Sequence, residues 1–87
     1  MISFCLSGYD WSQKEKDDMI TSLKELGFAI DDYGSCIFAK CFDFQINATV
    51  ISEIFTGELN IHIFKGKEPE HTLLKIPQKR ISAIYSL

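Results

Sequence analysis

The sequence lacks any apolar stretch long enough to span a membrane. No window approaches the run of about 18 apolar residues that a spanning helix requires. The first residues, 1–5, also carry none of the basic residues that open a secretion signal. We therefore expect a protein that has no membrane segment and stays in the cytoplasm.

Signatures of catalysis are missing as well. The glycines are dispersed, so that no phosphate-binding loop is present, and no serine lies in a Gly-x-Ser-x-Gly elbow. Cys36 and Cys41 have no flanking signature of a nucleophile that pairs with a histidine. His62 is expected in a strand, on the face opposite Ile61 and Ile63, as an ordinary sheet residue. We interpret the chain as a protein that is not an enzyme and needs no cofactor.

The 3 cysteines, Cys5, Cys36 and Cys41, form an odd set that does not suit a disulfide framework and indicates reduced thiols. All three have apolar, strand-like neighbours, where cysteine behaves as a small hydrophobic residue. A zinc site would need Cys36, Cys41, His62 and His71 to converge, and their spacing is not the about two to four residues of paired zinc ligands. No metal is expected.

Charge is unevenly distributed along the chain. The chain has 87 residues and a formal net charge of −3, which suits one domain over residues 1–87 and argues against general binding to nucleic acid. Residues 1–35 contain seven acidic side chains against three lysines, whereas residues 36–87 are close to neutral. The N-terminal third is therefore the acidic part of the protein.

Residues 12–26 predict an amphipathic helix. Ser12 and Glu15 have the spacing of a capping box, in which both side chains accept hydrogen bonds from backbone N–H groups at the helix start. Asp10 with Gln13 is a rival start. Apolar residues then recur at helical spacing on one face, namely Met19, Ile20, Leu23 and Leu26.

Alternating apolar residues predict strands on both sides of this helix. Ile2, Phe4 and Leu6 alternate with small residues before it. After Gly27, which ends the helix, strands are predicted at residues 28–30, 36–46, 59–65, 72–76 and 81–85, the last as an edge strand or a short helix. Side chains two apart share one face of a strand. The residues predicted to face the core in this way are Phe38, Phe42, Phe44, Ile46, Ala48, Val50, Leu59, Ile61 and Ile63.

Residues 47–56 leave two interpretations open. Thr49, Val50 and Ile51 are β-branched and favour strand, while Asn47 could cap a short helix that ends at Gly57. We favour strand, which predicts an α+β domain with one N-terminal amphipathic helix packed on a mainly antiparallel sheet of about five to seven strands. A helix there would instead produce the split βαβ arrangement of ferredoxin-like domains.

Four short segments follow one another in a pattern seen in a known family, namely residues 4–8, the helix from Ser12, residues 25–27 and residues 36–40. They resemble the first strand, first helix, Leu-Gly step and third strand of a BRCT domain, the phosphopeptide-reading module of DNA-damage proteins. The resemblance covers less than half of the chain and implies phosphopeptide binding. The chain departs from the family at its only tryptophan, Trp11, which precedes the first helix instead of lying in a late one.

Two surfaces are candidates for binding. The first combines aromatic anchors with carboxylates that complement a basic partner. Its predicted partner-binding residues are Tyr9, Asp10, Trp11, Asp17, Asp18, Asp31, Asp32 and Tyr33. A solvated helix face, with Trp11 packed over the helix start, is the alternative interpretation.

The second surface is a basic patch on the C-terminal hairpin, made of Lys65, Lys67, Lys75, Lys79 and Arg80. Lysines that protect a sheet edge from aggregation would look the same.

The acidic pole and the missing chemistry together favour a small protein–protein interaction module. We predict a monomer or homodimer that acts as an inhibitor by occluding a basic or nucleic-acid-acting protein. An immunity protein against a nuclease toxin and a phage inhibitor of a host defence complex are examples of this class. The alternative is a module that binds nucleic acid or phosphopeptides through the C-terminal basic residues.

Overall fold

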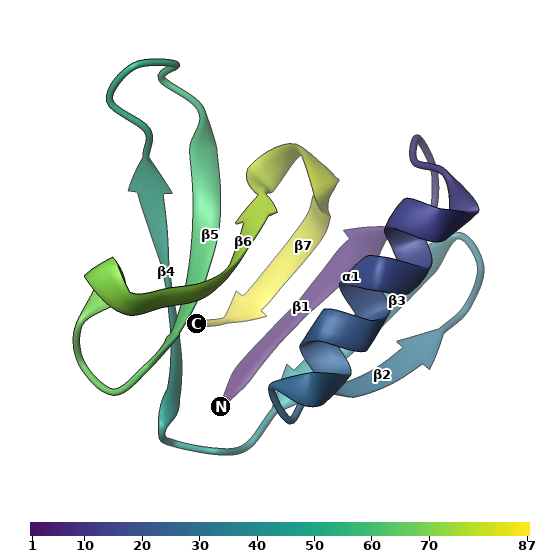
Figure 1. Ribbon diagram of the computed structural model, residues 1–87. Coiled ribbons are helices and arrows are strands. Elements are labelled where there is room, and N and C mark those ends of the chain that lie inside the picture. The colour runs from purple at the N-terminus through teal and green to yellow at the C-terminus, as the bar shows by residue number, and fades with distance from the viewer.

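The chain forms one α-helix and seven strands, and the computed structural model describes all residues, 1–87 (Figure 1). In chain order the elements are β1 (Ile2–Ser7), α1 (Gln13–Glu25), β2 (Ala29–Asp32), β3 (Cys36–Cys41), β4 (Ile46–Ser52), β5 (Leu59–Lys65), the 3₁₀ turn η1 (Pro69–His71), β6 (Thr72–Pro77), the 3₁₀ turn η2 (Gln78–Arg80) and β7 (Ile81–Ser86). Sheet A has the strand order β2-β3-β1-β7, and sheet B has the order β4-β5-β6. All pairings within both sheets are antiparallel.

The predicted fold class, α+β with one helix on antiparallel sheet, is confirmed, but the strands are divided between two sheets. The division arises at residues 42–45, which interrupt the strand predicted over residues 36–46. The carboxylate of Asp43 accepts a hydrogen bond from Gln45 N at 2.9 Å, and its carbonyl accepts one from Ile46 N at 3.1 Å. A short acidic side chain that satisfies nearby N–H groups in this way favours a turn over extended backbone.

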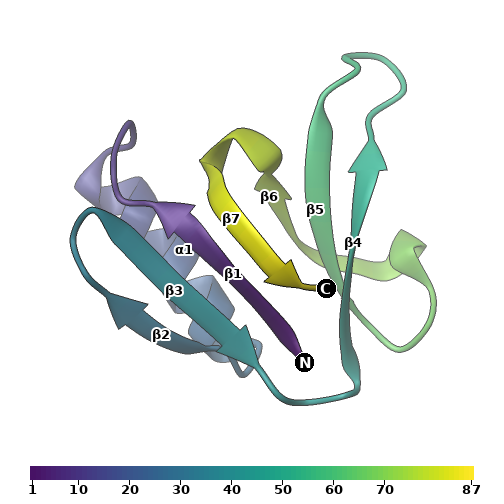
Figure 2. The same ribbon diagram turned by 180° about the vertical axis from the view of Figure 1, so that it is seen from behind.

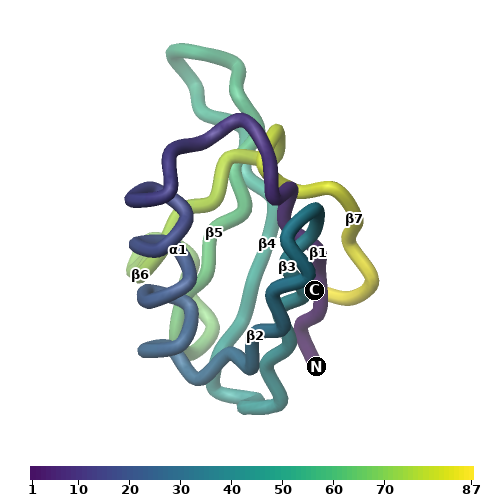
Figure 3. The backbone as a smooth tube through the Cα atoms, turned by 90° about the vertical axis from the view of Figure 1, so that its right-hand side faces the viewer, coloured from purple at the N-terminus to yellow at the C-terminus, as the bar shows by residue number.

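The N-terminal helix forms as predicted. Ser12 is the N-cap, and both bonds of the capping box are present, at 3.1 Å from Glu15 N to Ser12 Oγ and 3.4 Å from Ser12 N to the Glu15 carboxylate. Gly27 follows the helix with a φ of 98°, the left-handed conformation that glycine tolerates. Leu23 is fully buried. In the side view, α1, β5 and β6 lie on the same side of β1 and β3 (Figure 3).

Pairing between β1 and β3 decides which face of sheet A meets the core. Phe4 lies opposite Ala39, and both side chains are fully buried. The ring of Phe28 packs against that of Phe4, with centroids 5.7 Å apart. Because the two rings fill the space on this face, the small residue Ala39 suits the position opposite Phe4 on β3. The prediction that Phe38 faces the core is therefore wrong. Its ring lies on the outer face of sheet A and stacks on Tyr85, with centroids 5.4 Å apart.

The predicted alternation also fails at Phe42 and Phe44, which are 68% and 94% exposed because they lie in the turn between the sheets. Val50 and Leu59, which were also predicted to face the core, are 38% and 44% exposed, near the hairpin that joins β4 to β5. The alternation holds further along β5, where Ile61 and Ile63 are fully buried. Residues 47–56 form the rest of β4 and the following turn, so that the ferredoxin-like alternative, which needs a helix there, is wrong.

One hydrophobic core joins α1 to both sheets. Its buried members are Ile2, Phe4, Leu6, Leu23, Phe28, Ile37, Ala39, Cys41, Ile46, Ile61, Ile63 and Ile76. The rear view shows β3, β1 and β7 side by side with α1 behind them, so that the helix covers one face of sheet A only (Figure 2). None of the helices has the length and apolar character that crossing a lipid bilayer requires.

Candidate functional site

Two loops meet at the end of sheet A where β1 finishes and β3 begins. Gly8 N donates a hydrogen bond to Ser35 O at 3.0 Å, which ties the β1–α1 loop to the β2–β3 turn. A Cβ atom on Gly8 would lie 1.8 Å from Gly34 O, so that only glycine permits this approach. The two loops are therefore held together as one surface.

We call these two loops and the adjoining end of β2 the tyrosine end, which consists of Tyr9, Asp10, Asp31, Asp32 and Tyr33. Asp32 lies on the α1 side of β2, beside Lys16, whereas Asp31 lies opposite Phe38 on the other face of sheet A. Tyr9 and Tyr33 are 64% and 68% exposed. The backbone beneath them is fixed by bonds from Tyr9 N to Ser7 Oγ at 3.2 Å and from Tyr33 N to Cys36 O at 2.9 Å. A surface whose backbone is already ordered loses less conformational entropy when it binds a partner.

The tyrosine end is negatively charged. A hydrogen bond from Gly34 N, at 2.8 Å, lowers the pKa of Asp32, and Lys16 at 3.3 Å lowers it further. Asp10 and Asp31 form no ion pair. Lys16, whose side chain is mostly buried, is therefore the only cation paired with the carboxylates of this surface.

The other two predicted carboxylates lie on the exposed face of α1 and already have partners. Asp18 accepts a hydrogen bond from Lys14 at 2.8 Å, which raises the pKa of Lys14. Asp17 accepts one from the side-chain amide of Gln13 at 2.8 Å. These pairs follow the i, i+4 spacing of neighbours on a helix surface, as expected for a solvated helix face.

Trp11, the third predicted aromatic, is not free on the surface. It is half-buried against the core, and the guanidinium of Arg80 lies 5.1 Å from the centre of its ring. Arg80 also donates a hydrogen bond to Asp10 O and lies 3.8 Å from the Glu15 carboxylate. The tryptophan therefore connects the helix start to η2, as the alternative interpretation proposed.

The five predicted basic residues do not form one patch. Lys65 lies at the end of β5. Lys79 and Arg80 follow Pro77, which pairs with Asn60 near the start of β5. Five residues of strand separate these positions, a distance of about 16 Å. Between them, Lys75 is bound to Glu53 at 3.2 Å. Lys67 lies in the loop after β5.

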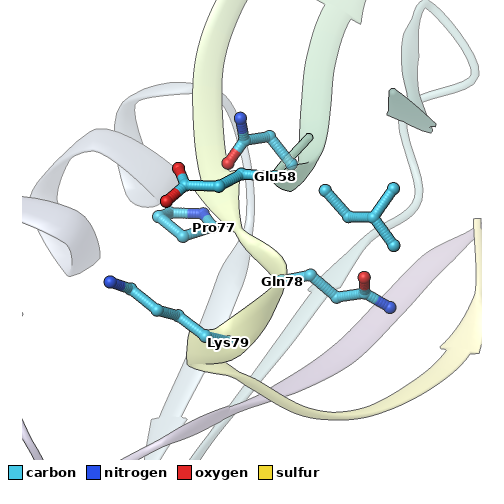
Figure 4. Close-up of a pocket in the computed structure, with 6 residues that line it drawn as sticks. Glu58, Pro77, Gln78 and Lys79 are labelled. Atoms are coloured by element: carbon cyan, nitrogen blue, oxygen red, sulfur yellow. The ribbon is translucent and has the colours of Figure 1, made fainter. Parts of the chain in front are cut away.

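A small hollow lies where β5 begins and β6 ends (Figure 4). It is lined by Glu58, Leu59, Asn60, Pro77, Gln78 and Lys79. The charged groups of Glu58 and Lys79 point to the same side of it (Figure 4). Its volume of about 240 Å³ is below the range of about 300–1,000 Å³ that is typical of small-molecule sites.

A polar network on the outer face of sheet B surrounds His62. Its Nδ1 lies 2.9 Å from Thr72 Oγ1, and its Nε2 lies 3.5 Å from Glu53 Oε1. Lys75 and Asn60 each donate to the same carboxylate oxygen at 3.2 Å, and the bond from Lys75 is the main reason why the pKa of Glu53 is lowered. Alternation predicted the face on which His62 lies, and that is confirmed.

The network runs from the Thr72 hydroxyl through the His62 imidazole to the Glu53 carboxylate. The hydroxyl, however, already donates its hydrogen to a backbone carbonyl. The Thr72 hydroxyl donates a hydrogen bond to Pro69 O at 2.6 Å, so that its oxygen accepts the hydrogen bond from His62 Nδ1–H. A hydroxyl bound in this way stabilises η1 against β5 and is not poised as a nucleophile. No pattern along the sequence indicated this network, because strand register and the η1 turn bring its members together.

The four residues that a zinc site would need do not converge as a set. Cys36 and Cys41 lie on opposite faces of β3, and all three cysteines are free thiols. Glu68, Glu70 and His71 approach one another in the exposed segment around η1. Exposed acidic groups commonly gather without binding a metal.

Comparisons of the chain with protein-family models, curated proteins and solved structures find no match. The resemblance to BRCT domains therefore gains no support. The chain also forms no α-helix after α1, and Trp11 precedes that helix.

Proposed function

We propose that the protein is an inhibitor that binds a basic partner protein through the tyrosine end and occludes its working surface. The supporting observation is that two exposed tyrosines lie on loops joined by a backbone hydrogen bond, at one end of sheet A that also carries three carboxylates. Tyrosine is among the residues that most often carry binding energy at interfaces. Immunity proteins against nuclease toxins and phage inhibitors of host defence complexes are inhibitors of this kind.

Carboxylates on the tyrosine end would act mainly on association. Proteins that work on nucleic acid carry clefts of lysine and arginine, because phosphate contacts dominate their affinity. An acidic surface is drawn into such a cleft over distances up to about a Debye length, roughly 8–10 Å at moderate salt. Association should therefore slow as salt rises, while the tyrosines hold the complex together after docking.

A panel of basic nuclease domains, studied by surface plasmon resonance at low and high salt, tests the proposal. Asp31→Lys should slow association by about tenfold or more, because it reverses an unpaired charge on the tyrosine end. Glu25→Lys is the matched control, because it changes the net charge equally at the other end of α1, about 20 Å from the helix start. Equal effects of the two variants would argue against a local site.

The tyrosines are tested by their effect on dissociation. Replacing Tyr9 and Tyr33 together by alanine should speed dissociation by about tenfold or more, since truncating an anchor residue commonly costs over about 1.4 kcal/mol. Both side chains are exposed, so that the variant should keep its fold. The proposal fails if no basic nuclease binds at low salt, or if binding is insensitive both to salt and to these substitutions.

A further inference from the structure

The edge of sheet B formed by β4 carries none of the features that usually prevent another strand from pairing with it. β4 has a strand on one side only, and its pairing with β5 is continuous from Ile46 to Ser52. The strand contains no charged residue and no proline. Natural proteins usually block an exposed edge with lysine, proline or a bulge, because its unpaired backbone groups accept another strand. β4 has none of these devices.

The hydrogen bonds at the two ends of β4 show which residues face the free edge. Gln45 O accepts a bond from Gly66 N, and Glu53 N donates one to Glu58 O, both at 2.8 Å. Residues of an antiparallel strand bond to their neighbour alternately. Odd-numbered residues of β4 therefore bond to β5, and residues 48, 50 and 52 direct their backbone groups to the free edge.

Exposed apolar side chains lie just beyond both ends of β4. Phe44 precedes the strand by two residues, and Ile54 follows it by two residues. Ile54 and Phe55 are 92% and 101% exposed at the tip of the β4–β5 hairpin, which projects beyond the rest of the fold (Figure 1). Thr49, the middle residue of β4, is equally distant along the chain from Phe44 and Ile54.

We propose that this edge binds a second copy of the chain, with the two β4 strands antiparallel about a two-fold axis at Thr49. In this register Ala48 lies opposite Val50 of the partner subunit, and both direct their backbone groups to the free edge. Phe44 then lies opposite Ile54 of the partner subunit and beside the partner's Phe55. The two copies of sheet B become one continuous sheet with the order β6-β5-β4-β4-β5-β6.

The spacing of the apolar residues favours a second copy as the occupant. A two-fold axis repeats every contact, so that both ends of β4 are covered by the same pair of side chains. Glu53 lies opposite Gln45 of the partner subunit, and no carboxylates face each other. Burial removes about 150–250 Å² per phenylalanine. Phe44 and Phe55 of both copies would therefore bury roughly 600–1,000 Å², and the paired strands bring the interface towards the about 1,200 Å² of stable complexes.

This inference does not rest on the proposed function. The tyrosine end belongs to sheet A and its loops, whereas the proposed interface belongs to sheet B. A dimer would present two tyrosine ends to its partners. Either property can therefore fail in an experiment without affecting the other.

Analytical ultracentrifugation of the purified protein at micromolar concentration tests the interface. We expect a dimer for the natural sequence. Phe44→Lys and Ile54→Glu should each raise the dissociation constant by about 100-fold, because each places two charges against apolar side chains in the symmetric dimer. Leu73→Lys, at an exposed position on the opposite edge strand β6, is the matched control and should leave the dimer intact.

Mixing the two disrupted variants tests the register itself. A heterodimer of Phe44→Lys with Ile54→Glu regains one Lys–Glu contact and keeps one Phe–Ile contact, so that the mixture should dimerise although each variant alone does not. Hydrogen exchange should show protection of the Val50 amide in the dimer only. Circular dichroism checks that each variant is folded.

Four results would overturn the proposal, of which the first three concern the proposed contacts themselves. These three are a natural protein that stays monomeric at hundreds of micromolar, a dimer that resists both substitutions, and a mixture that fails to associate. Dimerisation that disappears equally with Leu73→Lys would place the interface on β6 instead and would also refute it.

Discussion

Replacing Gly8 by alanine should loosen the tyrosine end and destabilise the whole protein. Gly8 does not adopt a positive φ, so that alanine suits its backbone conformation. The obstacle is space, because the new Cβ would lie 1.8 Å from Gly34 O, whereas real Cβ contacts essentially never fall below 3.0 Å. The two loops must therefore separate by more than 1 Å, which breaks the bond from Gly8 N to Ser35 O.

The expected loss of stability follows from these two effects. Forcing extra volume into a packed position costs about 1–3 kcal/mol, and a lost hydrogen bond costs about 0.5–1.5 kcal/mol. Alanine also restricts the unfolded chain, which offsets about 0.4–1 kcal/mol. At the middle of these ranges the net loss is about 2 kcal/mol, and a domain of this size loses about 4–8 °C in Tm per kcal/mol. The Tm should therefore fall by roughly 8–16 °C.

Differential scanning calorimetry and amide hydrogen exchange measure the two consequences. Exchange should speed up in residues 8–12 and 33–36. Gly66→Ala is the control, because Gly66 has a φ of 83° but open space around it, so that its variant suffers backbone strain without a collision. A Gly8→Ala protein with an unchanged Tm and unchanged exchange in both loops would refute the reasoning.

Further predictions concern the His62 network and the helix cap. Thr72→Val leaves His62 Nδ1 without a partner and should lower the free energy of unfolding by about 1–3 kcal/mol in urea titrations; an unchanged midpoint would show that water replaces the hydroxyl. The pKa of Glu53 is lower in the folded protein than its ordinary value of 4.5, so that its carboxylate stabilises the fold above pH 4.5 and this contribution disappears as the pH falls through the lower folded value. The difference in unfolding free energy between the natural protein and Glu53→Gln should therefore be constant near neutral pH and shrink in acid; a difference independent of pH would contradict this. Ser12→Ala removes one half of the capping box and should cost about 1 kcal/mol in thermal unfolding, whereas Ser12→Asp, which retains a capping oxygen, should cost less.

Local features of the fold could be predicted from the sequence. The capping box at Ser12 and Glu15, the apolar stripe of α1 and the glycine after it act within a few residues, and each has the predicted structure. The phase of β5 was also predictable, because its alternation is not interrupted by a turn.

Features that depend on distant parts of the chain were predicted less well. Phe42 and Phe44, on both sides of Asp43, continue the alternating pattern of a strand. The pattern therefore gave no sign of the turn at Asp43 that separates the two sheets. Which side chains of β3 face the core depends on the space that the rings of Phe4 and Phe28 leave opposite that strand. The alternation of residues within β3 carries no information about this space.

The candidate site shows the same limit. Their acidic surroundings predict Tyr9 and Tyr33 as binding residues, but the contact between Gly8 and Gly34 is what brings their loops together. The same surroundings predict Trp11, which Arg80, distant in sequence, covers. Composition therefore identified the residue types of the tyrosine end without showing which of them share a surface.

The position of β1 between β3 and β7 has a consequence for how the protein folds. Hydrogen bonds from Ser86 Oγ to Met1 O at 2.6 Å and from Ser82 Oγ to Cys5 O at 3.2 Å join segments about 80 residues apart in the chain. Contacts this far apart in sequence slow folding, because the intervening chain must be ordered before they form. A growing polypeptide on the ribosome can form α1 and pair β1 with β3 early, but sheet A stays incomplete until β7 has also emerged.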